Sequence, residues 1–289
     1  MHDNPQAAST PNFALSDHHV ISLAGRDAVA FAQAQFMNDI DAVATGYWQW
    51  NGWLTPKGRV VALFALLRID DETLWLLLPD ADPVSMVAAL QRFVFRSKVT
   101  LAVREDLKVS AAFAAPDVAD GAHFSGNETN AVELDLGGEG GPRRLRIGIE
   151  AVGEDEALLA RWLSFDLQHG LPRLPASQVE QWTPQQLSLE RLHGFSVKKG
   201  CYPGQEIVAR THFLGKAKRG LALIDGTAPI AVGSEVRGDG AALGTVVCSG
   251  TVDGRFVALA VLPLDRAQQP MAIDGHPVSE RPLLDGLAR

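Results

Sequence analysis

The feature that most limits the fold of this chain is the shortness of its apolar runs. The longest, Val60 to Leu67, ends at Arg68 and is far too short to cross a bilayer as a helix. Asp70-Asp71-Glu72 separates it from a second apolar run, Thr73 to Leu78, and the two runs predict a β-hairpin. Asp82-Pro83 then predicts the N-cap and first residue of a helix.

The same order recurs further along the chain. Val132 to Leu136 and Arg144 to Ile149 flank a glycine-rich connection and predict a second hairpin. Acidic residues 154–156 favour the start of a helix that Gly170 can end. Two hairpin-then-helix units therefore predict paired α+β subdomains.

Two further helices are predicted from their starting residues. Asp27 is a candidate N-cap for an Ala-rich helix that runs toward Phe36. Thr183 and Gln186 satisfy the capping-box pattern of a short helix that Gly194 can end.

The sequence pattern changes from Lys216 onward. Short apolar runs at 221–224, 245–247 and 256–261 alternate with glycine-rich turns such as Asp253-Gly254. Evenly spaced short strands predict a small β-barrel as the last unit. We therefore expect units at residues 1–104, 105–214 and 215–289.

Composition excludes several classes of protein. Lys and Arg total 26 and Asp and Glu total 34, so the net charge is −8. This balance disfavours a large nucleic-acid footprint, and we expect no direct nucleic-acid binding; the only basic strip is Lys216 to Arg219. Cys201 and Cys248 are the only cysteines, which excludes a disulfide framework and a multi-cysteine metal motif. Residues 1–11 are polar, unlike a signal peptide, so we expect a cytoplasmic protein without a membrane anchor.

The segment Lys199-Gly200-Cys201-Tyr202-Pro203-Gly204-Gln205-Glu206, called the signature segment below, holds the clearest candidate for chemistry. Two glycines bracket the cysteine and allow sharp turns or close approach to a ligand. Lys198 and Lys199 precede the thiol, and nearby cations favour a thiolate. Cys201 could then act as a nucleophile, a redox-sensitive thiol or one metal ligand, whereas packing is the alternative role of a lone cysteine. For Cys248 the sequence predicts only a packing role.

The signature segment resembles that of the YgfZ-type proteins, which are relatives of the glycine-cleavage T-protein, an aminomethyltransferase. The resemblance extends over nearly the whole chain, through residues 25–28, 38–39, 54–59 and 96–99 before the signature segment, and 184–185, 207–210 and 218–219 around it. It implies an α+β fold: two ferredoxin-like, T-protein-like subdomains around a central folate pocket, with a C-terminal β-barrel. It also implies a tetrahydrofolate-binding accessory protein that supports assembly or repair of iron–sulfur enzymes, including tRNA-modifying ones.

The resemblance also suggests individual site residues. Glu190 matches the position where T-proteins set a carboxylate against the aminopyrimidine edge of the pterin, which can donate two parallel hydrogen bonds. The reactive groups would be Cys201 and Lys199. The residues expected to bind tetrahydrofolate, or a one-carbon derivative, are Glu190, Gln185, Tyr202, Gln205, Arg59, Arg210 and Trp53; no metal ligands are expected. Expected partners are a reduced folate and iron–sulfur client or assembly proteins.

One departure separates the chain from T-proteins. Their acidic pair corresponds to residues 56–61, where this chain has no Asp or Glu. Aminomethyl transfer would lose an electrostatic partner for its developing charge, so we do not expect a glycine-cleavage enzyme. Two alternatives stay open: a folate-dependent one-carbon transferase in which Asp39 or Glu206 substitutes for the missing carboxylate, or a non-catalytic scaffold that binds other proteins.

Overall fold

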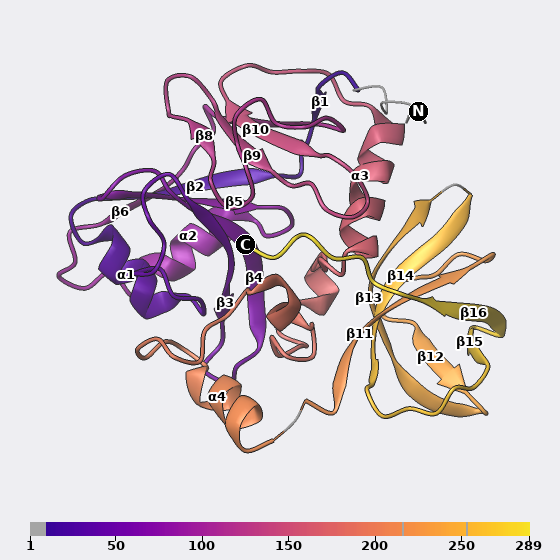
Figure 1. The fold of residues 1–289 in the computed structure, drawn as a ribbon. Coiled ribbons are helices and arrows are strands. Elements are labelled where there is room, and N and C mark those ends of the chain that lie inside the picture. Colours follow the sequence, from indigo (N-terminus) through magenta and orange to yellow (C-terminus); the bar gives the residue numbers. More distant parts are fainter. Residues whose placement is uncertain (1–9, 216, 253) are drawn as a thin grey trace, which may run out of the picture.

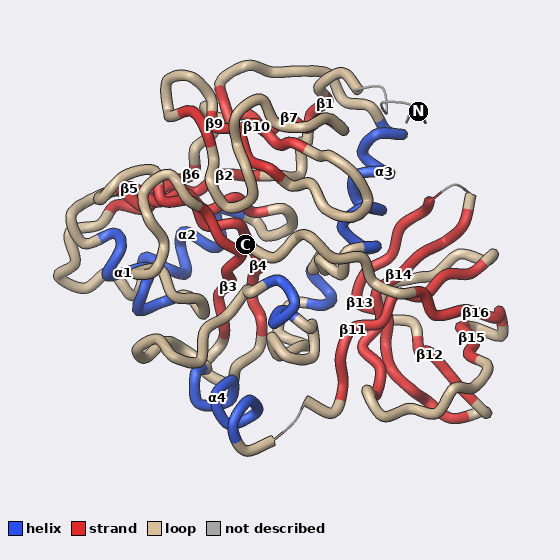
Figure 2. Tube along the Cα trace, in the orientation of Figure 1, coloured by secondary structure: helices blue, strands red, loops and turns tan. Residues whose placement is uncertain are grey.

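The computed structural model describes residues 10–215, 217–252 and 254–289. It contains two five-stranded sheets and a closed barrel (Figures 1 and 2). The expectations for residues 1–9, for Lys216 in the basic strip and for Asp253 lie outside the described residues.

The first sheet, with order β3-β4-β5-β2-β6, carries two helices on one face. Its elements are β2 (His19–Ala24), α1 (Ala28–Gln35), β3 (Trp48–Leu54), β4 (Val60–Arg68), β5 (Thr73–Leu78), α2 (Pro83–Gln91) and β6 (Thr100–Val103). The predicted hairpin is confirmed as β4 and β5, which pair antiparallel. The second sheet has order β1-β7-β10-β9-β8. Its elements are β1 (Phe13–Ala14), β7 (Lys108–Ala112), β8 (Ser125–Gly126), β9 (Val132–Asp135), β10 (Arg144–Gly148) and the adjacent α3 (Glu156–Gln168).

The barrel has order β11-β14-β13-β12-β15-β16 and confirms the prediction from the glycine-punctuated runs. Its strands are β11 (Arg219–Gly226), β12 (Glu235–Gly238), β13 (Ala241–Val252), β14 (Arg255–Pro263), β15 (Met271–Ile273) and β16 (His276–Arg281). Between α3 and the barrel lie η1 (Ala176–Gln178), η2 (Leu189–Leu192) and α4 (Gln205–Phe213). The predicted fold class, α+β with a C-terminal barrel, is confirmed.

Strand β4 shows how one apolar run joins two cores. Leu63, Ala65 and Leu67 face a core shared with the second sheet, α3 and one side of the barrel. Ala62, Phe64 and Leu66 face the core beneath α1 and α2. Because a strand alternates its faces, a continuous apolar run is what a strand buried on both sides requires.

The chain crosses the predicted unit boundaries at both ends. β1 pairs with β7, so residues 13–14 belong to the second sheet although they precede the first. After β16, residues 282–289 leave the barrel and return to the first sheet (Figure 1), where Trp50 Nε1 donates to Leu287 O at 2.7 Å. The boundaries at 104/105 and 214/215 stay predictions.

Two helix starts behave differently from each other. Asp82 caps α2 as predicted, since its Oδ2 accepts from Ser85 N at 2.9 Å and Pro83 is the first helical residue. Asp27 is the N-cap residue of α1, as predicted, but its side chain makes no capping hydrogen bond. Its Oδ2 accepts from Lys98 N at 2.6 Å instead, a contact with a residue 71 positions away.

The helix predicted from Thr183 to Gly194 is corrected. The capping box forms, because Thr183 N donates to Gln186 Oε1 and Gln186 N donates to Thr183 Oγ1. Ser188 then takes φ +50°, which breaks the helix and leaves a turn followed by η2. His193, at φ +54°, takes the left-handed position expected of Gly194. Within the described residues, no helix is long and apolar enough to cross a membrane.

Candidate functional site

The signature segment leads from η2 into α4, whose first two residues are Gln205 and Glu206. Gly204 precedes the helix with φ +81°, a conformation that favours glycine. The sequence analysis did not predict α4. The eight-residue motif is therefore a loop presenting Cys201, followed by the beginning of a helix.

Lys199 fixes this loop to the first sheet's helical layer. Its side chain is buried, with 6% of the residue exposed, and Nζ donates to three backbone carbonyls at the end of α1. The distances are 2.6 Å to Gln33 O, 2.6 Å to Phe36 O and 2.9 Å to Asn38 O. An ammonium has three N–H donors, so all of them are used.

Burial also changes the titration of Lys199. Desolvation disfavours the charged ammonium, whereas Asp39 and Asp41 favour it. Desolvation prevails and lowers the pKa of Lys199 from 10.5 to about 8.

Neighbours on both sides of Cys201 brace the loop. The Tyr202 hydroxyl donates to Ser196 O at 3.0 Å, and its ring centroid lies 5.0 Å from Lys199 Nζ. Burial raises the pKa of Tyr202 to about 12. Gln205 Nε2 donates to Lys199 O at 3.0 Å. Cys201 itself is exposed, so the segment presents one thiol from an otherwise anchored loop.

Close backbone packing holds the segment against the turn between β3 and β4. A Cβ on Gly204 would lie 2.7 Å from Gly58 Cα and 2.7 Å from Thr55 O. A Cβ on Gly58 would lie 2.8 Å from Ile207 Cβ. Only glycines permit this approach of α4 to the turn.

A cavity of about 350 Å³ lies beside the segment and has the size of a small-molecule site. Elements far apart in sequence line it: Asn38, Asp39, Ala42, Gln49, Glu190, His193, Phe195, Ser196, Val197, Lys198, His212 and Arg289. The Glu190 side chain is 68% exposed, and its Oε1 lies 3.6 Å from His212 Nδ1.

Some of the buried polar atoms without a partner belong to residues that line this cavity or to the strand β3 beside it. Among the described residues, Gln49 Nε2, Asn51 Nδ2 and Arg289 Nε are buried and have no hydrogen-bond partner. Gln49 and Asn51 are two positions apart on β3 and so point to the same face. Buried donors cost free energy unless something accepts from them. A ligand with several acceptor atoms, such as a folate, fits this donor set.

Arg289 reaches the cavity through the returning segment. Its Nη2 donates to Asp135 O and Gly137 O, and its Cζ lies 5.5 Å from the Trp48 ring. Burial lowers the pKa of Arg289. The cavity is thus lined by a partly buried cation, Arg289, and by the exposed Glu190 carboxylate.

The structure brings only part of the predicted set to this cavity. Glu190 lines it, whereas Lys199, Tyr202 and Gln205 brace the loop that adjoins it. Gln185 Nε2 donates to Val208 O and ties α4 to the preceding turn.

The remaining predicted ligands point elsewhere. Arg59 Nη1 donates to Gln181 O, Arg210 is exposed on α4, and Trp53 packs against the Phe93 ring at 6.4 Å. Sequence reasoning missed Gln49 and Arg289. Because side chains alternate between the two faces of a strand, the sequence of β3 could have indicated which face Gln49 occupies. No local sequence pattern indicates that Arg289 lines the cavity.

The second cysteine and the possible metal ligands lie outside this cavity. Cys248 is buried in the barrel wall, where burial raises the pKa of its thiol to about 12, as packing requires. In the described part of the chain, no three His, Cys, Asp or Glu side chains gather into a group that could hold a metal ion.

Known proteins resemble this chain in sequence and in fold. A tRNA-modifying protein YgfZ of Vibrio vulnificus is 29% identical over 276 residues, which cover 87% of this chain and 83% of the relative. The protein of the same name from Colwellia psychrerythraea is 30% identical over 225 residues, which cover 72% and 69%. The glycine cleavage system aminomethyltransferase T from Bartonella henselae shares the fold, with a TM-score of 0.72 at 14% identity over 94% of this chain and 85% of that one. No family model matches the chain.

The glycine contact between α4 and the β3–β4 turn can be tested within the signature segment. Gly204→Ala should lower the free energy of unfolding by at least about 2 kcal/mol, because its Cβ meets backbone atoms and its φ is positive. Gly200→Ala is the matched control, since no described atom lies within 4 Å of its Cβ; it should change stability by less than about 0.5 kcal/mol. Urea denaturation measures both, and equal effects would contradict the contact.

The buried Lys199 ammonium predicts a pH dependence of stability. Between pH 8 and 10.5 the unfolded chain holds a proton on Lys199 that the folded chain has lost, so stability should rise with pH. The free energy of unfolding relative to Lys199→Met should therefore increase by up to about 3 kcal/mol across this window. Denaturation curves at pH 7.5 and 10 give the difference, with the exposed Lys198→Met as control. A difference that is constant with pH would contradict the buried ammonium.

Proposed function

Because this chain belongs to the family of YgfZ tRNA-modifying proteins, we propose that it is a cytoplasmic tetrahydrofolate-binding accessory protein. In this proposal it supports the assembly or repair of iron–sulfur enzymes, including those that modify tRNA. The observation that carries the folate assignment is the cavity of about 350 Å³, two of whose lining residues, Gln49 and Arg289, have unpartnered donors.

The cavity offers complementary groups for a flat heterocycle with a charged tail. The Glu190 carboxylate would accept from the aminopyrimidine edge of a pterin. The amide of Gln49 would donate to ring acceptors, and Arg289 would attract negative charge. The bound folate would supply or take up a one-carbon unit; the chain's own contribution is to bind and orient it.

We assign the reactive role to Cys201, because the loop is anchored on both sides of it while its thiol is exposed. An exposed thiol on a fixed loop is accessible to a protein partner. One thiolate cannot hold a [4Fe–4S] cluster alone, since such clusters need about four. The proposal therefore makes Cys201 a contact with client iron–sulfur proteins rather than a resident cluster ligand.

Lys199 takes a different role from the reactive one expected from the sequence. Its three N–H donors go to carbonyl oxygens, so we propose that it positions the loop that presents Cys201. This role explains the lysine without requiring contact with the thiol.

One-carbon transfer to an unidentified acceptor is the second candidate, favoured by Asp39. Asp39 lines the cavity, while Glu206 lies exposed in the first turn of α4. Of the two substitutes for the missing carboxylate, only Asp39 is therefore placed at the cavity. Product formation from a methylene-folate donor, abolished by Asp39→Asn, would favour transfer over the accessory role.

Folate binding is tested by titrating the purified protein with tetrahydrofolate and following tryptophan fluorescence, with calorimetry as an independent readout. Saturable binding should weaken about 10-fold in Glu190→Gln, because a charge-assisted hydrogen-bond pair is lost. Gln49→Leu should weaken it by a similar factor. The matched control is Glu206→Gln, an exposed carboxylate on α4. Absence of binding at millimolar folate would overturn the cofactor assignment and favour the scaffold.

The role of Cys201 is tested in cells that lack the native gene. Cys201→Ser should abolish rescue of iron–sulfur tRNA-modifying activity, while the thermal midpoint of the purified variant stays unchanged because the side chain is exposed. Cys248→Ala is the control; it should rescue activity at a cost of about 1 kcal/mol in stability. Full rescue by Cys201→Ser would show that another group carries the reaction.

A further inference from the structure

The loop after α2 exposes two phenylalanines. Phe95 is 74% exposed and Phe93 is 49% exposed. Exposed aromatic rings that lie together are commonly part of a binding surface. We call residues 92–98, Arg92 to Lys98, the aromatic loop.

The conformation of Arg96 organises this loop. Arg96 has φ +61°, an uncommon conformation for a residue with a Cβ. Its guanidinium carbon lies 5.0 Å from the centroid of the Phe95 ring. The loop thus holds a cation against an exposed aromatic face, and strained backbone of this kind is concentrated at functional sites.

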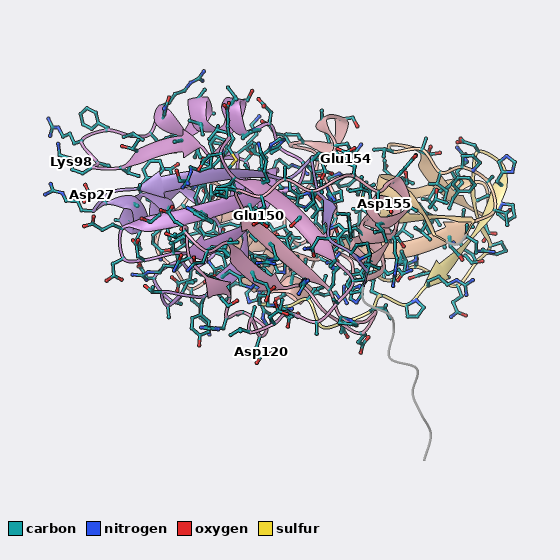
Figure 3. All side chains as sticks on the ribbon, turned by 90° about the horizontal axis from the view of Figure 1, so that it is seen from above. Asp27, Lys98, Asp120, Glu150, Glu154 and Asp155 are labelled. Atoms are coloured by element: carbon teal, nitrogen blue, oxygen red, sulfur yellow. The ribbon has the colours of Figure 1, made fainter. Side chains whose placement is uncertain are left out.

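Three cationic residues share the aromatic loop with the two phenylalanines, and one of them, Arg96, lies against the Phe95 ring. Arg92, Arg96 and Lys98 are exposed, and none of them forms an ion pair with a described residue. Acidic groups lie on the α1 side of the loop. Asp27 Oδ2 accepts from Lys98 N, and Asp27 Oδ1 lies 3.9 Å from Arg26 Nε. Figure 3 shows Asp27 and Lys98 together at the end of the molecule opposite the barrel.

The turn Asp70-Asp71-Glu72 adds acid near Gly25, since Gly25 N donates to Glu72 O at 2.9 Å. Of the three cations, Lys98 lies next to this acidic side, because its backbone N–H donates to Asp27, whereas Arg96 lies against Phe95. A surface this small is compatible with a chain of net charge −8.

A short series of contacts connects the aromatic loop to the signature segment. The Phe93 ring lies 6.4 Å from the Trp53 ring, and Trp53 forms a β-bridge with Phe36. Phe36 O accepts from Lys199 Nζ. The aromatic loop and the signature segment therefore both contact the neighbourhood of the same two residues, Trp53 and Phe36, in the first unit.

We propose that the aromatic loop binds an unpaired segment of RNA. Bases would stack on Phe95, and Arg92, Arg96 and Lys98 would contact phosphates. An exposed ring combined with unpaired cations fits a polyanion with flat bases better than it fits a neutral apolar protein surface. The inference rests on the proposed function in one respect, that the chain acts on enzymes whose substrate is tRNA.

The test is fluorescence anisotropy of the full chain with a labelled 12-nucleotide single-stranded RNA at several salt concentrations. Phe95→Ala should weaken binding at least about 5-fold through lost stacking. Arg96→Asn, which tolerates positive φ, should weaken it and reduce the steepness of the salt dependence by about 0.7 in the log–log slope. Leu264→Ala, which removes an exposed apolar side chain from the barrel unit, should leave binding unchanged.

Folate titration separates this inference from the proposed function. Phe95→Ala should bind tetrahydrofolate as tightly as the unaltered chain, because Phe95 lies outside the residues that line the cavity. A chain that binds folate but not RNA, or binds RNA equally in all three variants, would overturn the RNA proposal alone. In the first case a protein would be the partner of the loop. RNA binding that depends on Phe95 in a chain without folate affinity would support this inference and overturn the cofactor assignment.

Discussion

The buried ammonium of Lys199 is the interaction on which the candidate site depends. Removing a cation from water is costly, and the structure offsets this cost with three carbonyl oxygens at the end of α1 and with the nearby carboxylates of Asp39 and Asp41. These carbonyls lie at the end of a helix, where the last C=O groups have no partner within the helix. The Lys199 side chain therefore gives these carbonyls a donor, and they give the buried ammonium its acceptors. The result is a loop from the second half of the chain fixed to a helix from the first 40 residues.

Local patterns predicted the elements that local interactions determine. The Asp82-Pro83 start of α2 and the β4–β5 hairpin need only neighbouring residues, and both are confirmed. Asp27 has the same residue type as Asp82 and also occupies an N-cap position, yet its carboxylate accepts from Lys98 N and not from a backbone N–H of α1. The residue was predicted correctly, but its side-chain bond was not, because a partner 71 residues away competes with the helix N–H groups.

The candidate site was predictable only in part for a related reason. The signature segment could be recognised as a unit, because its glycines and cysteine are contiguous. The cavity is assembled from the segment after α1, from β3, from η2 and the segment that follows it, from α4 and from residues 282–289. Nothing near Arg289 in the sequence indicates that its side chain lies against Trp48, since that contact depends on how the barrel returns the chain. Glu190 was found through resemblance alone, and its exposed side chain has no local pattern that distinguishes it from a solvated glutamate.

The β3–β4 turn shows how a segment without carboxylates can serve the signature segment through close packing. Residues 56–61 carry no carboxylate, and the turn contacts α4 through Gly58 and Gly204. A side chain on Gly58 would meet Ile207, so an aspartate there would displace the helix that completes the signature segment. In this chain the turn supports the loop that presents a thiol.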